Sequence, residues 1–179
     1  MNPSEMAFDD SRSVAMTVNG RAVTLTVESR RTLAEVLREE LGLTGTHLGC
    51  EHGICGACTV LTDTQPVRSC LMLAVQADGA SVETIESLAD HGRFGPLQQA
   101  MWDSHAFQCA FCAPGFLMTI KALLASNPNP TKAQIREELA GNLCRCTGYA
   151  SIVAGVEAAI AATATDASTS PTTSEVGHG

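Results

Sequence analysis

Eight cysteines are the residues whose type and spacing most directly indicate chemistry in this chain. Four of them form a first group: Cys50, Cys55, Cys58 and Cys70. The first three have the C-x4-C-x2-C spacing of plant-type [2Fe–2S] sites, in which the fourth cysteine lies further along the chain. Three thiolates on one short loop can wrap around a small cluster, and a fourth thiolate from a neighbouring strand completes the ligand set.

Glycines are interleaved with this group, at positions 49, 53 and 56. Glycine lets the backbone pass close to a cluster and direct N–H groups at its sulfur atoms. Two other metal sites fit less well. Structural zinc usually shows two separate ligand pairs, and the mixed His/Cys site that Cys50-Glu51-His52 could begin has no C-x2-H half to complete it. We therefore interpret the first group as a [2Fe–2S] site.

The second group consists of two close pairs: Cys109, Cys112, Cys144 and Cys146. Its spacing is less specific, because a lone C-x2-C is also typical of a redox-active dithiol or of half a zinc site. A dithiol leaves the second pair unexplained, and C-x-C is tight for tetrahedral zinc. Both pairs precede expected helix starts, at Pro114 and near Ser151, where the positive helix ends would stabilise an anionic cluster. A second cluster is favoured, and the alternatives stay open.

The composition limits the classes of function. The net charge of −8 argues against nucleic-acid binding, which needs clustered Lys and Arg. No apolar run approaches the roughly 20 residues of a membrane span, and Met1 to Ser13 lacks the basic and apolar regions of an export signal. We therefore expect a cytoplasmic protein without a membrane span. In a reducing compartment, cysteines serve more often as metal ligands than in disulfides.

Local patterns predict strands and one helix in the first half. Apolar residues alternate over 14–18 and over 23–27, on either side of Asn19-Gly20, which is a strong hairpin signal. Thr32 and Glu35 form a capping-box pattern that opens a helix ending near Gly42. Further strands are expected at 59–62, 67–73 and 82–85. The result is a small sheet with a helix across one face.

The second half reads as helical. Pro96 and Pro114 can each open a helix, and the second of these should run to about Ser126, before Asn127-Pro128. Thr131 with Gln134 is a second capping box. An alanine-rich helix is expected over 151–162.

Together the cysteine motifs resemble the small iron–sulfur subunit, or N-terminal region, of the xanthine dehydrogenase, aldehyde oxidoreductase and carbon monoxide dehydrogenase family of molybdenum hydroxylases. The similarity covers roughly residues 14–162. It rests on four segments in the family's order: Gly49–Val60, Val67–Leu71, Gln108–Gly115 and Gly141–Tyr149.

The resemblance implies an α+β fold, in which a β-grasp, ferredoxin-like domain precedes an all-α, four-helix-type [2Fe–2S]-binding domain. It also implies that the second cysteine group holds a second cluster. The expected division is a flexible N-terminus, a plant-type [2Fe–2S] ferredoxin-like domain, the helical domain and a disordered tail, at 1–12, 13–88, 89–162 and 163–179.

The resemblance further implies partner subunits. Electrons would leave molybdopterin-bound molybdenum on a large subunit, enter the helical-domain cluster, pass to the ferredoxin-domain cluster and reach FAD on a medium subunit. The assembly would be a dimer of heterotrimers. In the family, the glutamine before the second-site pair and the last cysteine of C-R-C contact the pterin, and here these residues are Gln108 and Cys146. All eight cysteines would be cluster ligands, and no residue of this chain would be catalytic.

The sequence departs from the family pattern at Ala110, where the family usually has glycine. The position supplies no ligand, so we expect an effect on local packing or on the N–H geometry around the cluster. Two other functions stay open: a free-standing ferredoxin-type carrier, for which one cluster would suffice, and a zinc-binding interaction module. The substrate of the complex is not specified by this chain.

Overall fold

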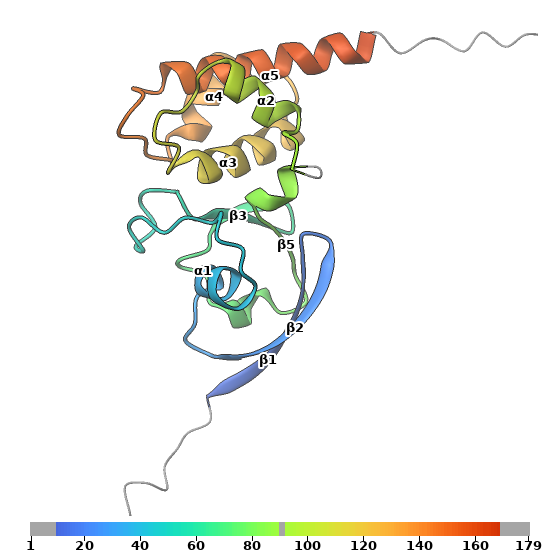
Figure 1. Ribbon diagram of the computed structural model, residues 1–179, viewed down its shortest axis with the longest axis vertical. Coiled ribbons are helices and arrows are strands. Elements are labelled where there is room, and N and C mark those ends of the chain that lie inside the picture. The colour runs from blue at the N-terminus through green and yellow to red at the C-terminus, as the bar shows by residue number, and fades with distance from the viewer. Residues whose placement is uncertain (1–9, 90–91, 169–179) are drawn as a thin grey trace, which may run out of the picture.

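The computed structural model describes residues 10–89 and 92–168. Figure 1 shows two stacked parts, a β-sheet with a short helix below and a group of helices above. The sheet has five strands in the order β2-β1-β5-β3-β4, with β1 and β5 parallel and the other neighbours antiparallel. The strands are β1 Ser11–Val18, β2 Arg21–Glu28, β3 Thr59–Thr62, β4 Gln65–Arg68 and β5 Ser81–Glu83.

The first hairpin forms as predicted. Val18 pairs with Arg21, and the two turn residues Asn19 and Gly20 have φ of 49° and 77°. Positive φ at both positions is what a type I′ turn requires, and Asn-Gly provides it at low cost. The alternating apolar residues of β1 all point inward, because Val14, Met16 and Val18 are buried.

The first helix begins at the predicted cap but differs in its last turn. The Thr32 hydroxyl accepts the Glu35 N–H, and the Glu35 carboxylate accepts the Thr32 N–H, so the capping box is confirmed. Helix α1 covers Leu33–Glu35 and continues as a π-helical turn, η2, over Val36–Glu40. The expectation of a regular α-helix is therefore wrong there, although the chain leaves the helix at Gly42, whose φ is +67°, as expected.

The strand predicted over 67–73 is too long. Strand β4 ends at Arg68, and the Ser69 N–H and hydroxyl both bond to the carbonyl of Cys58. These bonds turn the backbone toward the first cysteine loop and bring Cys70 beside it. The strand predicted at 82–85 is likewise shorter, because β5 ends at Glu83 and residues Ile85–Leu88 form the 3₁₀ turn η4.

Four helices form the upper part: α2 Pro96–Asp103, α3 Ala113–Ser126, α4 Lys132–Leu139 and α5 Ala150–Ser168. The α4 capping box at Thr131 and Gln134 is confirmed. Helix α5 continues six residues beyond its predicted end and covers the first residues of the tail expected at 163–179. Thr163 lies in this extension and bonds its hydroxyl to the carbonyl of Ala159, one turn back. The remainder of that tail and most of the expected flexible N-terminus lie outside the described residues.

Each part has its own apolar core, and α3 joins them. The lower core lies between the sheet and α1, and the upper core lies between the helices. Helix α3 packs against β3 (Figure 1), and Lys121 of α3 forms an ion pair with Glu83 of β5. Ile85 and Leu88 pack on the upper core although they precede the boundary predicted at 88, which stays a prediction. Among the described residues, no helix is long and apolar enough to cross a membrane.

Candidate iron–sulfur sites

The first cysteine group comes together as expected. Cys50, Cys55 and Cys58 lie on the loop that leads into β3, and Cys70 lies in the turn after β4. The Cys55 N–H donates to the sulfur of Cys50 at 3.3 Å, and the thiols of these two cysteines are also in contact. The thiol of Cys70 contacts that of Cys58, so the four sulfurs approach one another as two pairs.

The two pairs lie in different electrostatic surroundings. Backbone N–H groups, chiefly those of Cys55 and His52, lower the pKa of Cys50 to about 6 because they stabilise its thiolate. Burial raises the pKa of Cys70 to about 11, and the neighbouring Cys58 thiol adds to this rise. His47 and His52 point their Nδ1 atoms at the carbonyls of Phe111 and Cys50, and so bond to the backbone.

The second group also assembles as two pairs. The sulfurs of Cys109 and Cys146 are 3.6 Å apart, and the thiols of Cys112 and Cys144 are in contact. Burial, with a smaller contribution from Cys144, raises the pKa of Cys112 to about 12. At Cys144 burial also raises the pKa, but hydrogen bonds led by that of the Thr147 hydroxyl outweigh it, and the pKa is lowered.

Helix ends and a small hydrogen-bond network position the second group. Cys112 directly precedes α3, and Cys144 and Cys146 lie on the loop that leads into α5. The Thr147 hydroxyl bonds to the Cys144 sulfur at 3.2 Å, and the Tyr149 hydroxyl accepts the Cys144 N–H at 3.1 Å. Helix N-termini carry partial positive charge, which stabilises negative charge on the Cys112 sulfur at the start of α3. The Thr147 hydroxyl does the same for the Cys144 sulfur through its hydrogen bond.

A two-iron cluster fits both sets of residues. Over the described ranges, 10–89 and 92–168, no three His, Cys, Asp or Glu side chains meet closely enough for a single metal ion. Two thiol pairs per site instead suit two irons held by four cysteines. A Cβ added to Gly49 would lie 3.3 Å from the Cys55 sulfur, closer than an ordinary van der Waals contact, so glycine at this position leaves room beside that sulfur. The buried Thr46 hydroxyl, four residues before Cys50, has no hydrogen-bond partner among the residues that the structure describes.

The two cysteine loops touch each other directly. The N–H of Leu143 donates to the carbonyl of Cys55 at 2.9 Å. Leu143 directly precedes Cys144 in the sequence, so this hydrogen bond joins a cysteine of the first group to the residue next to a cysteine of the second. Spacing within either motif gives no signal for this contact, which brings together residues from opposite halves of the sequence.

Gln108 and Cys146 are both exposed. Gln108 lines a cavity of about 500 Å³ beside α2, together with Phe94, Met101 and Trp102 among others. Gln108 directly precedes Cys109, whose sulfur lies 3.6 Å from that of Cys146. Both side chains are therefore accessible to a group outside this chain.

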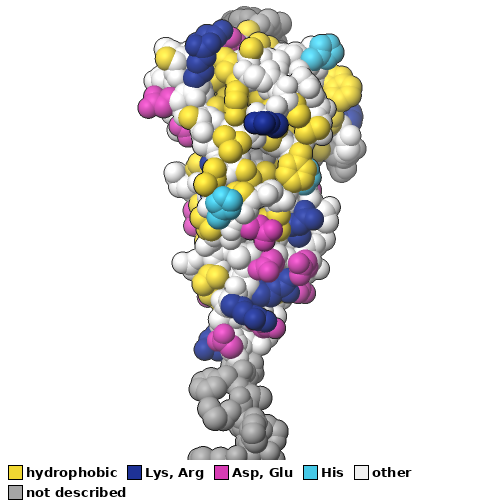
Figure 2. All heavy atoms as spheres, turned by 90° about the vertical axis from the view of Figure 1, so that its left-hand side faces the viewer, with side chains coloured by type: hydrophobic (Ala, Val, Ile, Leu, Met, Phe, Trp, Pro, Cys, Tyr) yellow, Lys and Arg dark blue, Asp and Glu magenta, His cyan; other side chains and the backbone are white. Residues whose placement is uncertain are grey.

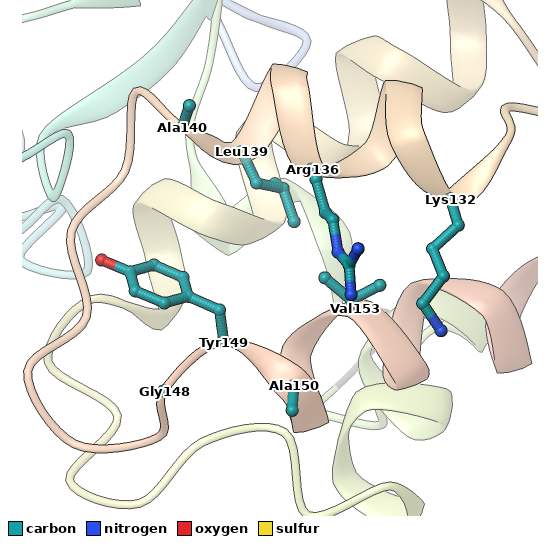
Figure 3. A pocket seen from close by; sticks show the side chains of 8 residues that line it. All are labelled: Lys132, Arg136, Leu139, Ala140, Gly148, Tyr149, Ala150 and Val153. Carbon is teal, nitrogen blue, oxygen red and sulfur yellow. The ribbon is translucent and has the colours of Figure 1, made fainter.

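A second cavity, of about 380 Å³, lies between α4 and the start of α5 (Figure 3). Its two cations come from α4, and Lys132 is already paired with Glu157 at 3.0 Å. Figure 3 shows the Tyr149 hydroxyl turned away from Lys132 and Arg136. This hydroxyl bonds the cysteine loop instead. Tyr149 closes the segment Gly141–Tyr149, but the spacing of that segment does not show that its hydroxyl accepts the Cys144 N–H five residues back.

Comparison with known proteins gives the same two units. Residues 16–88 match the family described as 2Fe-2S iron-sulfur cluster binding domain, and residues 84–157 match the [2Fe-2S] binding domain family. The caffeine dehydrogenase subunit gamma of Pseudomonas sp. (strain CBB1) is 52% identical over 82% of this chain and 90% of its own. The nicotine 6-hydroxylase small subunit of Paenarthrobacter nicotinovorans is 54% identical over 82% and 88%.

A solved structure agrees with these relatives. The crystal structure of quinoline 2-oxidoreductase from Pseudomonas putida 86 superimposes with a TM-score of 0.83 at 46% identity, covering 88% of this chain and 98% of that one. This chain belongs to the small iron–sulfur subunits of the molybdenum hydroxylase family. The family membership confirms the α+β fold, the two [2Fe–2S] domains and the role as a subunit of an oxidoreductase. The ligand role of each cysteine stays a prediction.

Proposed function

We propose that this chain is the electron-relay subunit of a molybdenum-containing hydroxylase or dehydrogenase. It takes electrons from a molybdopterin site on a large partner subunit and delivers them to FAD on a medium partner subunit. Its two [2Fe–2S] clusters supply one-electron transfer. The observation that carries the proposal is the hydrogen bond from Leu143 to Cys55, because it joins the two candidate sites without intervening side chains.

The eight cysteines would hold the clusters in two sets of four. The first set is Cys50, Cys55, Cys58 and Cys70, and the second is Cys109, Cys112, Cys144 and Cys146. Within each set the observed contacts suggest one thiol pair for each iron. The backbone N–H groups at Cys50 and the Thr147 hydroxyl at Cys144 would stabilise the negative charge of the bound clusters.

The second site would face the molybdopterin. Of the cysteines in this site, Cys109 and Cys146 are exposed, whereas Cys112 is buried. Gln108 and Cys146 are our candidates for contact with the pterin, because both can reach a group outside the chain. Electrons would then enter at the second site and leave from the first.

Exposed apolar side chains support partner subunits. Figure 2 shows hydrophobic atoms spread over the upper and middle parts of one face, while acidic and basic side chains gather lower down. Trp102, Ile54 and Leu71 are exposed by 66%, 61% and 58%, and Phe111 and Leu143 by nearly half. Apolar surface of this kind marks protein–protein contact. A cytoplasmic dimer of heterotrimers, with large molybdopterin and medium FAD subunits, is the assembly we propose.

The relatives suggest that this chain does not select the substrate. Proteins named for caffeine and for nicotine share about half of their aligned residues with it, and an aldehyde oxidoreductase subunit of Escherichia coli shares 40%. The similarity of chains from differently named enzymes supports the proposal that a partner subunit selects the substrate.

The proposal is tested by isolating the native complex through a tag on this chain. Large and medium subunits, molybdenum and FAD should copurify, with about four irons per copy of this chain. Elution as an isolated small protein would favour a free-standing carrier. A colourless, zinc-loaded protein would contradict both readings.

Two ligand variants test the division into sites. Cys70→Ser should damage one reduced-cluster EPR signal, and Cys144→Ser should damage the other. Loss of both signals from either variant, in a chain that remains folded, would contradict two separate sites.

A further inference from the structure

Three consecutive residues of the second cysteine loop bond to the lower domain. The carbonyl of Gly141 accepts from Arg68 Nη2 at 2.6 Å, the Asn142 side chain donates to the carbonyl of Gly56 at 3.0 Å, and the Leu143 N–H donates to Cys55. We call Gly141-Asn142-Leu143 the seam segment. It is the part of the second loop that immediately precedes Cys144.

Asn142 is the buried centre of the seam segment. Its side chain is 1% exposed, although asparagine is usually found at the surface. Its Nδ2 faces the Gly56 carbonyl, which can only accept a hydrogen bond, so its Oδ1 must face the Thr119 hydroxyl at 3.0 Å. One amide therefore ties together the first cysteine loop, the second cysteine loop and α3.

Glycines bring the two backbones into contact around this amide. Gly56 has a φ of +73°, and a Cβ added to it would lie 2.6 Å from the Gly141 carbonyl and 2.7 Å from Asn142 Nδ2. A Cβ added to Gly115 of α3 would lie 2.9 Å from the carbonyl carbon of Gly56. The backbones of the two cysteine loops are therefore in direct contact at Gly56 and Gly141. The hydrogen bonds of the seam segment then fix the distance between these loops.

Arg68 holds the seam segment from its other side. Its guanidinium bonds Gly141 through Nη2 and the Thr59 hydroxyl through Nη1, both at 2.6 Å. Charge-assisted bonds of this kind are directional and strong. Asn142 and Arg68 thus fix the same short segment from two directions, between Cys55 and Cys144.

We propose that Asn142 is a positioning residue that sets the separation, and thereby the magnetic and electronic coupling, of the two clusters. The inference rests on the proposed function for the presence of both clusters. Asn142 touches no cysteine side chain in the contacts described above, and it acts through the Leu143–Cys55 bond next to it. A purely structural asparagine would affect stability but leave the coupling of the remaining folded molecules unchanged.

The test uses the intact complex with Asn142→Leu, which keeps the branched shape and removes both polar contacts. The matched control is Asn127→Leu, since Asn127 lies in the same domain and its hydrogen bonds within the described part of the chain join Leu123 and Asn129 of its own segment. The readout is the spin–spin splitting in low-temperature EPR spectra of the fully reduced protein. We expect the splitting to shrink measurably in Asn142→Leu and to match the parent in the control.

A second variant keeps the test decisive. If Asn142→Leu does not retain about four irons per chain, Arg68→Met takes its place and should also shrink the splitting. An unchanged splitting in an iron-replete variant, or no splitting in the reduced parent, would overturn the inference. If the purified complex contained no molybdenum or FAD, the proposed function would be contradicted. The inference about Asn142 would stand, because it concerns only the two clusters of this chain.

Discussion

Gly115→Ala is expected to destabilise the protein, against the usual preference of helices for alanine. Gly115 lies in the first turn of α3, where its backbone faces the first cysteine loop. Alanine in a helix is worth about 0.5–1 kcal/mol over glycine when nothing opposes it. Here an added Cβ would also collide with the Gly56 carbonyl oxygen and would lie 2.9 Å from its carbon and 3.0 Å from Ala57 Cα.

The collision should outweigh the gain in helix propensity. Its partners are backbone atoms of a loop that is itself fixed by the seam bonds, so they cannot rotate away. Overpacking costs about 1–3 kcal/mol, and the absence of a flexible neighbour places this case at the upper end. After subtraction of the propensity term, about 2 kcal/mol of net destabilisation remains. For a chain of this size, that corresponds to a fall in the unfolding midpoint of roughly 4–8 °C.

The assay is anaerobic thermal unfolding of the complex at a fixed scan rate, since iron–sulfur proteins often unfold irreversibly and the midpoint then depends on the rate. Gly155→Ala is the matched control, because its added Cβ would lie 2.5 Å from the sulfur at the flexible end of Met101. We expect a smaller shift there. A Gly115→Ala midpoint equal to or above that of the parent would refute the packing argument.

Three further changes test other local features. Ala110 has a φ of +61°, so Ala110→Gly should relieve about 1 kcal/mol of strain and raise the thermal midpoint. Thr147→Val should lower the reduction potential of one cluster in a redox titration, because it removes a hydrogen bond to Cys144 and so stabilises the reduced state less. The Thr32 backbone N–H and hydroxyl lower the pKa of Glu35, so its carboxylate stabilises the fold above its unfolded pKa of about 4.3 and loses this effect as the pH falls through the lowered value. The difference in midpoint between the parent and Glu35→Gln should therefore stay constant from about pH 7 to pH 5 and shrink as the pH falls below about 4.3.

Local signals predicted the parts of the fold that local chemistry determines. The Asn19-Gly20 turn and the caps at Thr32 and Thr131 each depend on residues within four positions of one another, and all three are confirmed. The cysteine spacing likewise predicted two groups that the structure brings together. Whether each thiol binds iron stays a prediction.

Contacts between distant segments could not be predicted. Asn142 meets Gly56 across 86 positions, and Arg68 meets Gly141 across 73. Neither side chain has a neighbour in sequence that indicates its partner, and both pairings exist only because α3 packs on β3. The strand over 67–73 failed for the same reason, since apolar residues favour a strand there while the bonds of Ser69 to Cys58 end it.

The contact between Gly115 and Gly56 limits how evolution and engineering can recombine these domains. The two halves match separate domain families. At their contact, however, each half has a glycine where the backbone of the other half comes too close for a larger side chain. A chimera that takes its ferredoxin-like half from one relative and its helical half from another should therefore keep this packing only if the first parent has glycine at position 56 and the second has glycine at position 115.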